Sequence, residues 1–175
     1  MTSLRADAQR NLERVLDAAT EAFAASGPDV SVDEIARRAG VGHATVFRRF
    51  PTKDDLMLAV IERRVAEIHA ILVEELAAPD RGEAFYRFIW RISELHMQTP
   101  GLHDCVVRCG NKPGADHLDP LAEKLIARAQ RAGAVRRDVK PVDVSTLVKS
   151  VLQTAPPKDW RRYLGVVLDG LRPRG

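Results

Sequence analysis

The chain has 175 residues, of which 45% are apolar and 29% are charged, as in an ordinary globular protein. No run approaches the roughly 18 consecutive apolar residues of a membrane helix, and the charged N-terminal segment does not resemble a secretion signal. We therefore expect a cytoplasmic protein with no membrane partner. Lys and Arg number 27 against 24 for Asp and Glu, so the net charge by itself does not indicate nucleic-acid binding.

Helical periodicity appears along almost the whole chain, and no segment alternates polar and apolar residues with the two-residue period of a strand. The sequence therefore predicts an all-α protein. The expected helices cover about residues 7–26, 32–39, 43–50, 53–78, 83–98, 120–132, 142–154 and 158–171. Proline and glycine residues between 99 and 120 leave room for one short helix at most.

Two capping patterns set helix starts in the N-terminal third. Ser31 and Glu34 form a capping box, in which each side chain satisfies a free backbone amide at the start of the second helix. Thr52, with Asp55 three residues later, caps the fourth helix in the same way. Both patterns predict sharply defined helix starts.

Residues 32–50 have the features of a helix-turn-helix. Ala36 is small where two helices cross closely, and Gly40 can take the positive φ that a tight turn requires. The shared apolar core is expected to consist of Ile35, Val41, Val46 and Phe50. In such a unit the second helix lies in the major groove of DNA, with its N-terminal residues nearest the base edges.

The local charge around this segment favours DNA binding. No acidic residue lies between Glu34 and Asp54, whereas five basic residues do: Arg37, Arg38, Arg48, Arg49 and Lys53. Phosphate binding requires such local positive charge. The expected DNA contacts of the second helix are Gly42, His43, Ala44, Thr45, Phe47, Arg48 and Arg49. Of these, His43 and Arg48 have the reach and the donors to read a base edge. The pattern alone also allows a helical hairpin in which the arginines only face solvent.

Several segments resemble the TetR family of transcriptional regulators, namely Arg10–Ala19, Phe23, Gly27, Ile35–Val41 and Ala44–Leu56. The resemblance implies that the third helix enters the major groove and that Thr45 contacts DNA, commonly at a phosphate. It also implies that Lys53 contacts the phosphate backbone at the start of the fourth helix. The family usually has tyrosine in place of Phe47 and often serine in place of Gly42. One phosphate hydrogen bond and one cap or contact are therefore expected to be missing, and Arg48 and Arg49 could compensate.

The resemblance further implies two domains. A helix-turn-helix DNA-binding domain is expected over residues 1–53, and a helical domain that binds an effector and forms a homodimer over residues 54–175. The helix at 83–98 is apolar on more than one side, which is typical of a central helix. An apolar cavity with a few polar groups is the usual ligand site. Its expected wall residues are His69, Phe88, Ile92 and His96.

The histidines and cysteines of the same region also suggest a metal site. The possible ligands by residue type are His96, His103, Cys105, Cys109 and His117. Their spacing matches no compact zinc pattern, so neither a metal nor another cofactor is expected. Cys105 and Cys109 are interpreted as buried thiols, with a redox pair as the alternative.

Two apolar stripes near the C-terminus indicate either core or a two-fold interface. Helix-turn-helix proteins normally read their operators as dimers, which favours the interface. The residues expected at a dimer interface are Leu147, Val151, Trp160, Leu164 and Leu168.

These patterns together predict a ligand-responsive DNA-binding regulator whose partners are double-stranded operator DNA, an unknown small-molecule effector and a second copy of the chain. The simplest version is a repressor released from a palindromic operator by an apolar or aromatic effector, and activation is the alternative. No glycine-rich phosphate loop, nucleophile elbow, HExxH or paired-carboxylate motif is present, so an enzyme is not expected. A dimerisation module that has lost DNA binding is disfavoured by the intact set of Thr45, Arg48, Arg49 and Lys53.

Overall fold

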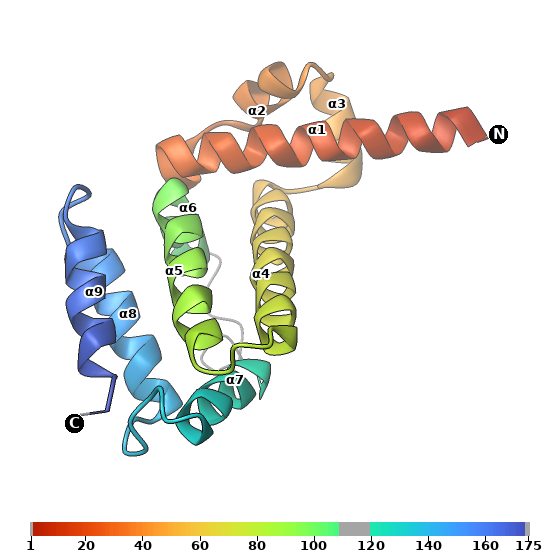
Figure 1. Ribbon diagram of the computed structural model, residues 1–175. Helices are drawn as coiled ribbons and strands as arrows, with labels where there is room; N and C mark the ends of the chain where they lie inside the picture. Colours follow the sequence, from red (N-terminus) through yellow and green to blue (C-terminus); the bar gives the residue numbers. More distant parts are fainter. Residues whose placement is uncertain (1, 109–119, 174–175) are drawn as a thin grey trace. The chain divides into compact units, whose positions relative to one another are not determined.

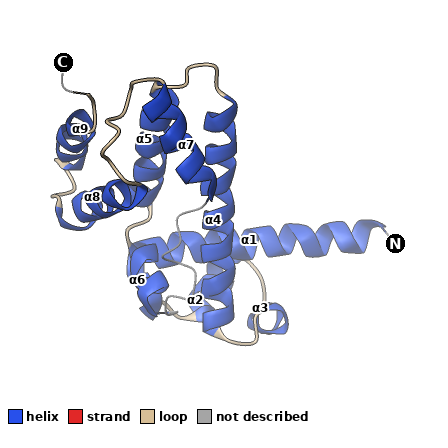
Figure 2. Cartoon of the chain, turned by 90° about the horizontal axis from the view of Figure 1, so that it is seen from below, coloured by secondary structure: helices blue, strands red, loops and turns tan. Residues whose placement is uncertain are grey.

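The computed structural model describes residues 2–108 and 120–173 (Figure 1). All regular structure in these ranges is helical and no strand occurs in them (Figure 2), which confirms the prediction of an all-α protein. None of the described helices is long and apolar enough to cross a bilayer. In chain order the elements are α1 (Thr2–Ser26), the 3₁₀ turn η1 (Gly27–Asp29), α2 (Val32–Ala39), α3 (His43–Arg49), α4 (Lys53–Ala77), α5 (Glu83–Gln98), α6 (Gly101–Arg108), α7 (Pro120–Arg131), α8 (Pro141–Thr154) and α9 (Trp160–Gly170).

The helices follow the expected ranges and differ from them mainly at their ends. α1 begins at Thr2, because neither glycine nor proline precedes Asp7 to interrupt it. α6 is the one short helix that the region after residue 99 was expected to allow. α9 begins at Trp160 and not at Lys158, because the residues after Pro156 form a turn.

The described residues form two compact units. The N-terminal unit contains residues 2–66 and 98–108, and the body unit contains residues 67–97 and 120–173. α4 begins in the N-terminal unit and ends in the body unit. The N-terminal unit extends beyond residues 1–53, because α6 packs against α1 and η1.

The core of the N-terminal unit is built from apolar side chains of α1, α2, α3, α4 and α6. Its fully buried large side chains are Phe23, Ile35, Val46, Leu56, Met57, Val60 and Cys105. α6 approaches α1 closely: a Cβ added at Gly101 would lie 2.1 Å from the carbonyl oxygen of Phe23. The absence of a side chain at Gly101 is therefore required for this packing.

The residues considered for metal or redox chemistry do not form a cluster in the described part of the chain. Cys105 is buried in the core of the N-terminal unit. Cys109, His117 and the side chain of His103 lie outside the described residues. No group of three or more potential metal-ligating side chains occurs among the residues that are described.

The core of the body unit combines the second half of α4 with α5, α7, α8 and α9. Its fully buried large side chains include Leu72, Phe85, Leu125, Val135 and Leu164. These residues come from five segments that are distant in sequence, so the unit is held by long-range apolar packing.

Hydrogen bonds from charged side chains hold the C-terminal end of α4 in the body unit. The carboxylate of Glu75 is buried and accepts hydrogen bonds from Nε of Arg87 at 3.1 Å and from Nη1 of Arg91 at 3.0 Å. The guanidinium of Arg128 on α7 donates to the carbonyl oxygens of Leu76 and, at 2.6 Å, Ala78. These contacts satisfy carbonyl groups that a helix end leaves without partners and tie α4 to α5 and α7.

Candidate nucleic-acid interface

A tight glycine turn joins α2 to α3. The Oγ of Ser31 accepts a hydrogen bond from the Glu34 amide at 3.2 Å, so the Ser31 half of the predicted capping box is confirmed. The reciprocal half is absent, because the Glu34 carboxylate accepts from Arg37 and Arg38 and not from the Ser31 amide. At the other end of α2, Gly40 has a φ of +64°, which confirms the predicted positive φ. The amide of Val41 then donates to the Ala36 carbonyl at 3.1 Å, as in a helix that ends in a left-handed glycine. The turn fixes the position of α3 on α2.

α3 has one face in the core and another open to solvent. Val46 is buried, and Phe50, just after the helix, is almost fully buried. Thr45 and Phe47 are half-buried. The other expected DNA contacts of this segment are exposed, namely Gly42, His43, Ala44, Arg48 and Arg49. α3 contains no acidic residue, so its open face carries positive charge only.

Not all of the basic residues in this region are available to phosphates. The carboxylate of Glu34 bridges Arg37 at 2.7 Å and Arg38 at 2.8 Å. The hydrogen bonds from Arg37, then from Arg38, lower the pKa of Glu34 to about 2, so it stays ionised and paired. Arg48, Arg49 and Lys53 form no ion pair with any described residue. Glu34 thus offsets part of the positive charge of α2, whereas the positive charges of Arg48, Arg49 and Lys53 are not offset by an ion pair in the described part of the chain.

Lys53 is the first residue of α4, where a reciprocal cap defines the helix start. The Oγ1 of Thr52 accepts from the Asp55 amide at 3.1 Å, and the Asp55 carboxylate accepts from the Thr52 amide at 2.9 Å. The predicted cap is confirmed. A lysine beside free amides at a helix N-terminus is suited to a phosphate.

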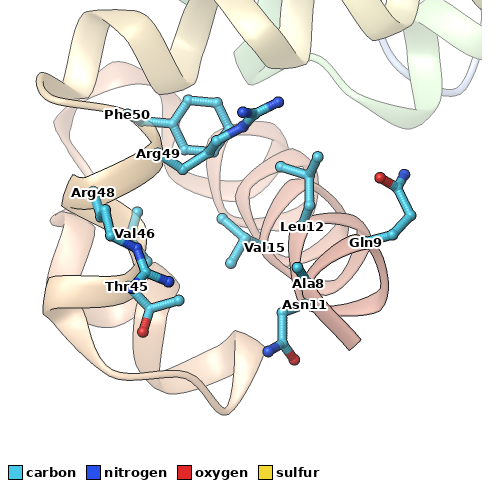
Figure 3. Close-up of a pocket in the computed structure, with 10 residues that line it drawn as sticks. All are labelled: Ala8, Gln9, Asn11, Leu12, Val15, Thr45, Val46, Arg48, Arg49 and Phe50. Atoms are coloured by element: carbon cyan, nitrogen blue, oxygen red, sulfur yellow. The ribbon is translucent and has the colours of Figure 1, made fainter. Parts of the chain in front are cut away.

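A groove of about 410 Å³ separates the N-terminal part of α1 from α3 (Figure 3). Thr45 and Arg48 of α3 lie opposite Asn11 of α1 in this view. The full lining consists of Ala8, Gln9, Asn11, Leu12, Val15, Thr45, Val46, Arg48, Arg49 and Phe50. Gln9 and Asn11 are not among the DNA contacts that the sequence predicts. The only indication in the sequence is that these two residues lie one to two helical turns before Val15, the first buried residue among the described side chains of α1.

The N-terminal unit thus has the geometry of a helix-turn-helix. Residues 15–60 match the family described as bacterial regulatory proteins, tetR family. Residues 80–173 match the C-terminal domain of SbtR-like transcriptional regulators. The chain belongs to the TetR family. This membership places it among transcriptional regulators and not among enzymes.

Solved structures of other TetR regulators resemble this chain over nearly its whole length. A TetR transcription regulatory protein from Mycobacterium vanbaalenii has a TM-score of 0.73 and 42% identity, covering 97% of this chain and 99% of its own. The TetR regulator SCO0520 from Streptomyces coelicolor has a TM-score of 0.72 and 30% identity, covering 93% of this chain and 99% of its own.

Curated relatives match over a shorter region. The HTH-type transcriptional repressor Rv3405c from Mycobacterium tuberculosis is 42% identical over 65 residues, which make up 37% of this chain and 35% of that protein. The chain spans less than half the length of the first curated relatives that it matches.

In this TetR protein the residues expected at an effector pocket differ in burial. Phe88 is buried in the core of the body unit, and Ile92 and His96 are half-buried on the same helix, α5. His69 on α4 is exposed. The place of His69 in the wall of an effector pocket stays a prediction, and His69 is not part of the buried core of the body unit.

The helical geometry of α4 explains the position of His69. Ile68, Ile71 and Leu72 pack against the core of the body unit, and Glu75 is buried beside it. These residues define the inward face of α4, and His69 lies to one side of this face because successive helical residues are rotated by about 100°.

Ser93 is an interior polar residue that is not among the effector-pocket residues predicted from the sequence. Its side chain is fully buried on α5, and its Oγ has no hydrogen-bond partner among the described residues. A buried hydroxyl without a partner is unfavourable by about 1–3 kcal/mol. The only signal in the sequence is that Ser93 lies at helical spacing from the apolar residues Tyr86 and Ile89.

The five residues expected at a dimer interface fall into two groups. Leu147 is 42% exposed, and Val151 is half-buried. Trp160, Leu164 and Leu168 are instead buried in the core of their own unit. These three form the inward stripe of α9, so they are not available to a second copy.

Other side chains of the last two helices remain accessible. Six large apolar side chains are exposed in the described part of the chain, and four of them belong to α8 and α9. These four are Val142, Leu147, Tyr163 and Val166.

Proposed function

We propose that this TetR regulator is a repressor that binds a two-fold symmetric operator as a cytoplasmic homodimer. A small apolar or aromatic effector, bound in the body unit, releases it from the DNA. The observation that carries the DNA-binding part is the open face of α3, where Arg48 and Arg49 have no carboxylate partner among the described residues. The name of the relative Rv3405c, a transcriptional repressor, supports repression.

Selection of binding sites from random double-stranded DNA tests this function. We expect the purified protein to enrich a palindrome-like sequence, because two copies of α3 related by a two-fold axis read two half-sites about one helical turn apart. Affinity should fall steeply with salt concentration, because phosphate neutralisation releases counterions. Enrichment of no sequence at all would contradict the proposal.

Release by an effector requires a path from the body unit to the DNA-binding residues, and α4 provides it. α4 is continuous from Lys53 to Ala77. Its last turns are tied to α5 through Glu75 and to α7 through Arg128. An effector that binds better when α5 has shifted would change the position of α4 and with it the position of Lys53. The strength of the effect is limited by the difference in effector affinity between the two states.

We propose that the effector site lies along α5, with Phe88, Ile92 and His96 at its wall and Ser93 as its hydrogen-bonding group. Ser93→Ala should leave operator affinity unchanged and weaken an effector about 2- to 12-fold, the worth of one hydrogen bond. Compounds from a library of small apolar and aromatic molecules that release labelled operator serve as effectors in this test. Ser150→Ala, at an exposed serine of α8, is the matched control. Equal effector affinity in both variants would place the site elsewhere.

A further inference from the structure

A side-chain hydrogen bond links the first residue of α3 to a residue of α2. Nδ1 of His43 is hydrogen-bonded to Oδ1 of Asp33, which lies in the first turn of α2. The ring of Phe47, one turn along α3, packs on the imidazole with a centroid separation of 4.4 Å and an interplanar angle of 30°. One edge and one face of the imidazole are therefore fixed by the protein.

The identity of Asp33 decides which nitrogen of His43 carries the proton. An ionised carboxylate has no proton to donate and can only accept a hydrogen bond. Nδ1 must therefore be the protonated nitrogen, and in the neutral ring Nε2 carries a lone pair and acts as an acceptor. Nε2 has no partner among the described residues, and 54% of the His43 side chain is exposed.

We propose that Asp33 is a specificity-determining residue: by fixing the tautomer of His43 it makes Nε2 an acceptor for the amino group of adenine or cytosine in the major groove. The inference rests on the proposed function, in which α3 is the recognition helix. Adenine N6 and cytosine N4 are the donors on the major-groove edges, whereas guanine and thymine present acceptors at the corresponding positions. With the ring neutral, His43 thus disfavours guanine and thymine at the base that it faces, because Nε2 then has no proton to donate to their acceptors.

The electrostatic position of Asp33 supports a role in selectivity. A carboxylate beside the DNA-binding face repels phosphates and lowers affinity for every sequence equally. The Asp33 side chain is 77% exposed, so it does not contribute to the apolar core of the N-terminal unit. A residue that weakens general binding while fixing a base-reading group increases the difference between matched and mismatched sites.

The tautomer can be measured without DNA. Nitrogen-15 NMR of the histidine rings, in alkaline buffer where an unperturbed imidazole is neutral, should show His43 protonated at Nδ1 in the wild-type chain. Asp33→Asn should change this pattern, because an amide can either donate to Nδ1 or accept from it. A wild-type His43 protonated at Nε2 would overturn the inference whatever the DNA results are.

Site selection then tests the consequence for base reading. His43→Ala identifies the operator position that His43 contacts, and adenine or cytosine should be enriched there by the wild-type chain. Asp33→Asn should reduce this preference about 2- to 12-fold, the worth of one hydrogen bond, without weakening binding overall. Asp54→Asn, which removes one negative charge from the first turn of α4, is the matched control and should keep the wild-type preference.

The outcomes separate the two proposals. If the wild-type chain selects a palindrome and Asp33→Asn keeps the same base preference at every position, the role of Asp33 is wrong while the proposed function stands. If neither chain selects any sequence, the proposed function fails, and the NMR result still decides whether Asp33 fixes the tautomer.

Discussion

Leu147→Glu is expected to convert the proposed homodimer into a folded monomer that binds its operator weakly. Leu147 lies on α8 and is 42% exposed within the chain, so a glutamate there is tolerated by a single subunit. At a two-fold interface the substitution would bury a charge from each copy, which is strongly unfavourable. We expect the dimer dissociation constant to rise by about 100-fold or more, which corresponds to about 3 kcal/mol. Light scattering measures the mass, and circular dichroism measures the helix content.

Variants at two further positions of α9 test whether the loss of dimerisation is specific to exposed side chains. Val166→Glu, on the exposed side of α9, should also yield a monomer. Leu164→Glu should instead unfold the body unit, because Leu164 is fully buried in its core, and even Leu164→Ala should lower the free energy of unfolding by about 2–5 kcal/mol. If Leu147→Glu and Val166→Glu both remain dimeric, the interface lies on another surface of the chain.

Arg48→Ala and Lys53→Ala are expected to weaken DNA binding in different ways. Arg48 lies on the exposed face of α3, and its loss should cost about 1–3 kcal/mol at one operator position and relax the base preference there. Lys53 lies at the N-terminus of α4 and is expected to contact a phosphate. Its loss should weaken all sequences about equally and reduce the slope of log affinity against log salt by about one unit per subunit.

Arg37→Ala provides the matched control for the loss of one positive charge in the same unit. Arg37 is already bound to Glu34, so its removal should change operator affinity and the salt slope much less than removal of Lys53. Binding curves at several salt concentrations, on the selected operator and on a scrambled duplex, measure these quantities. An unchanged base profile for Arg48→Ala would show that Arg48 does not read a base.

The starts of α2 and α4 and the turn after α2 could be predicted from the sequence because their causes are local. Ser31 and Thr52 cap amides only three residues away, and Gly40 supplies the positive φ of the turn within its own backbone. Such short-range hydrogen bonds and torsional preferences do not depend on the rest of the fold. The ion pairs of Glu34 with Arg37 and Arg38 are also local, at three- and four-residue spacing.

The tertiary structure decided which apolar residues face the core and which remain accessible. Helical periodicity identifies a stripe on α9, but a stripe can face its own domain or a partner. Packing in the body unit places Trp160, Leu164 and Leu168 inside and leaves Tyr163 and Val166 exposed. The burial of Ser93 and the exposure of His69 likewise depend on helices that are distant in sequence.

The sequence by itself determined the family, the all-α class and the positions of the residues expected to contact DNA, because each of these depends on local pattern or on close similarity. The pairing of Asp33 with His43 required the fold. These residues are ten positions apart on different helices, and their side chains meet only because the turn at Gly40 brings the start of α3 beside the start of α2. Long-range packing, which a pattern of single residues does not encode, decides such contacts.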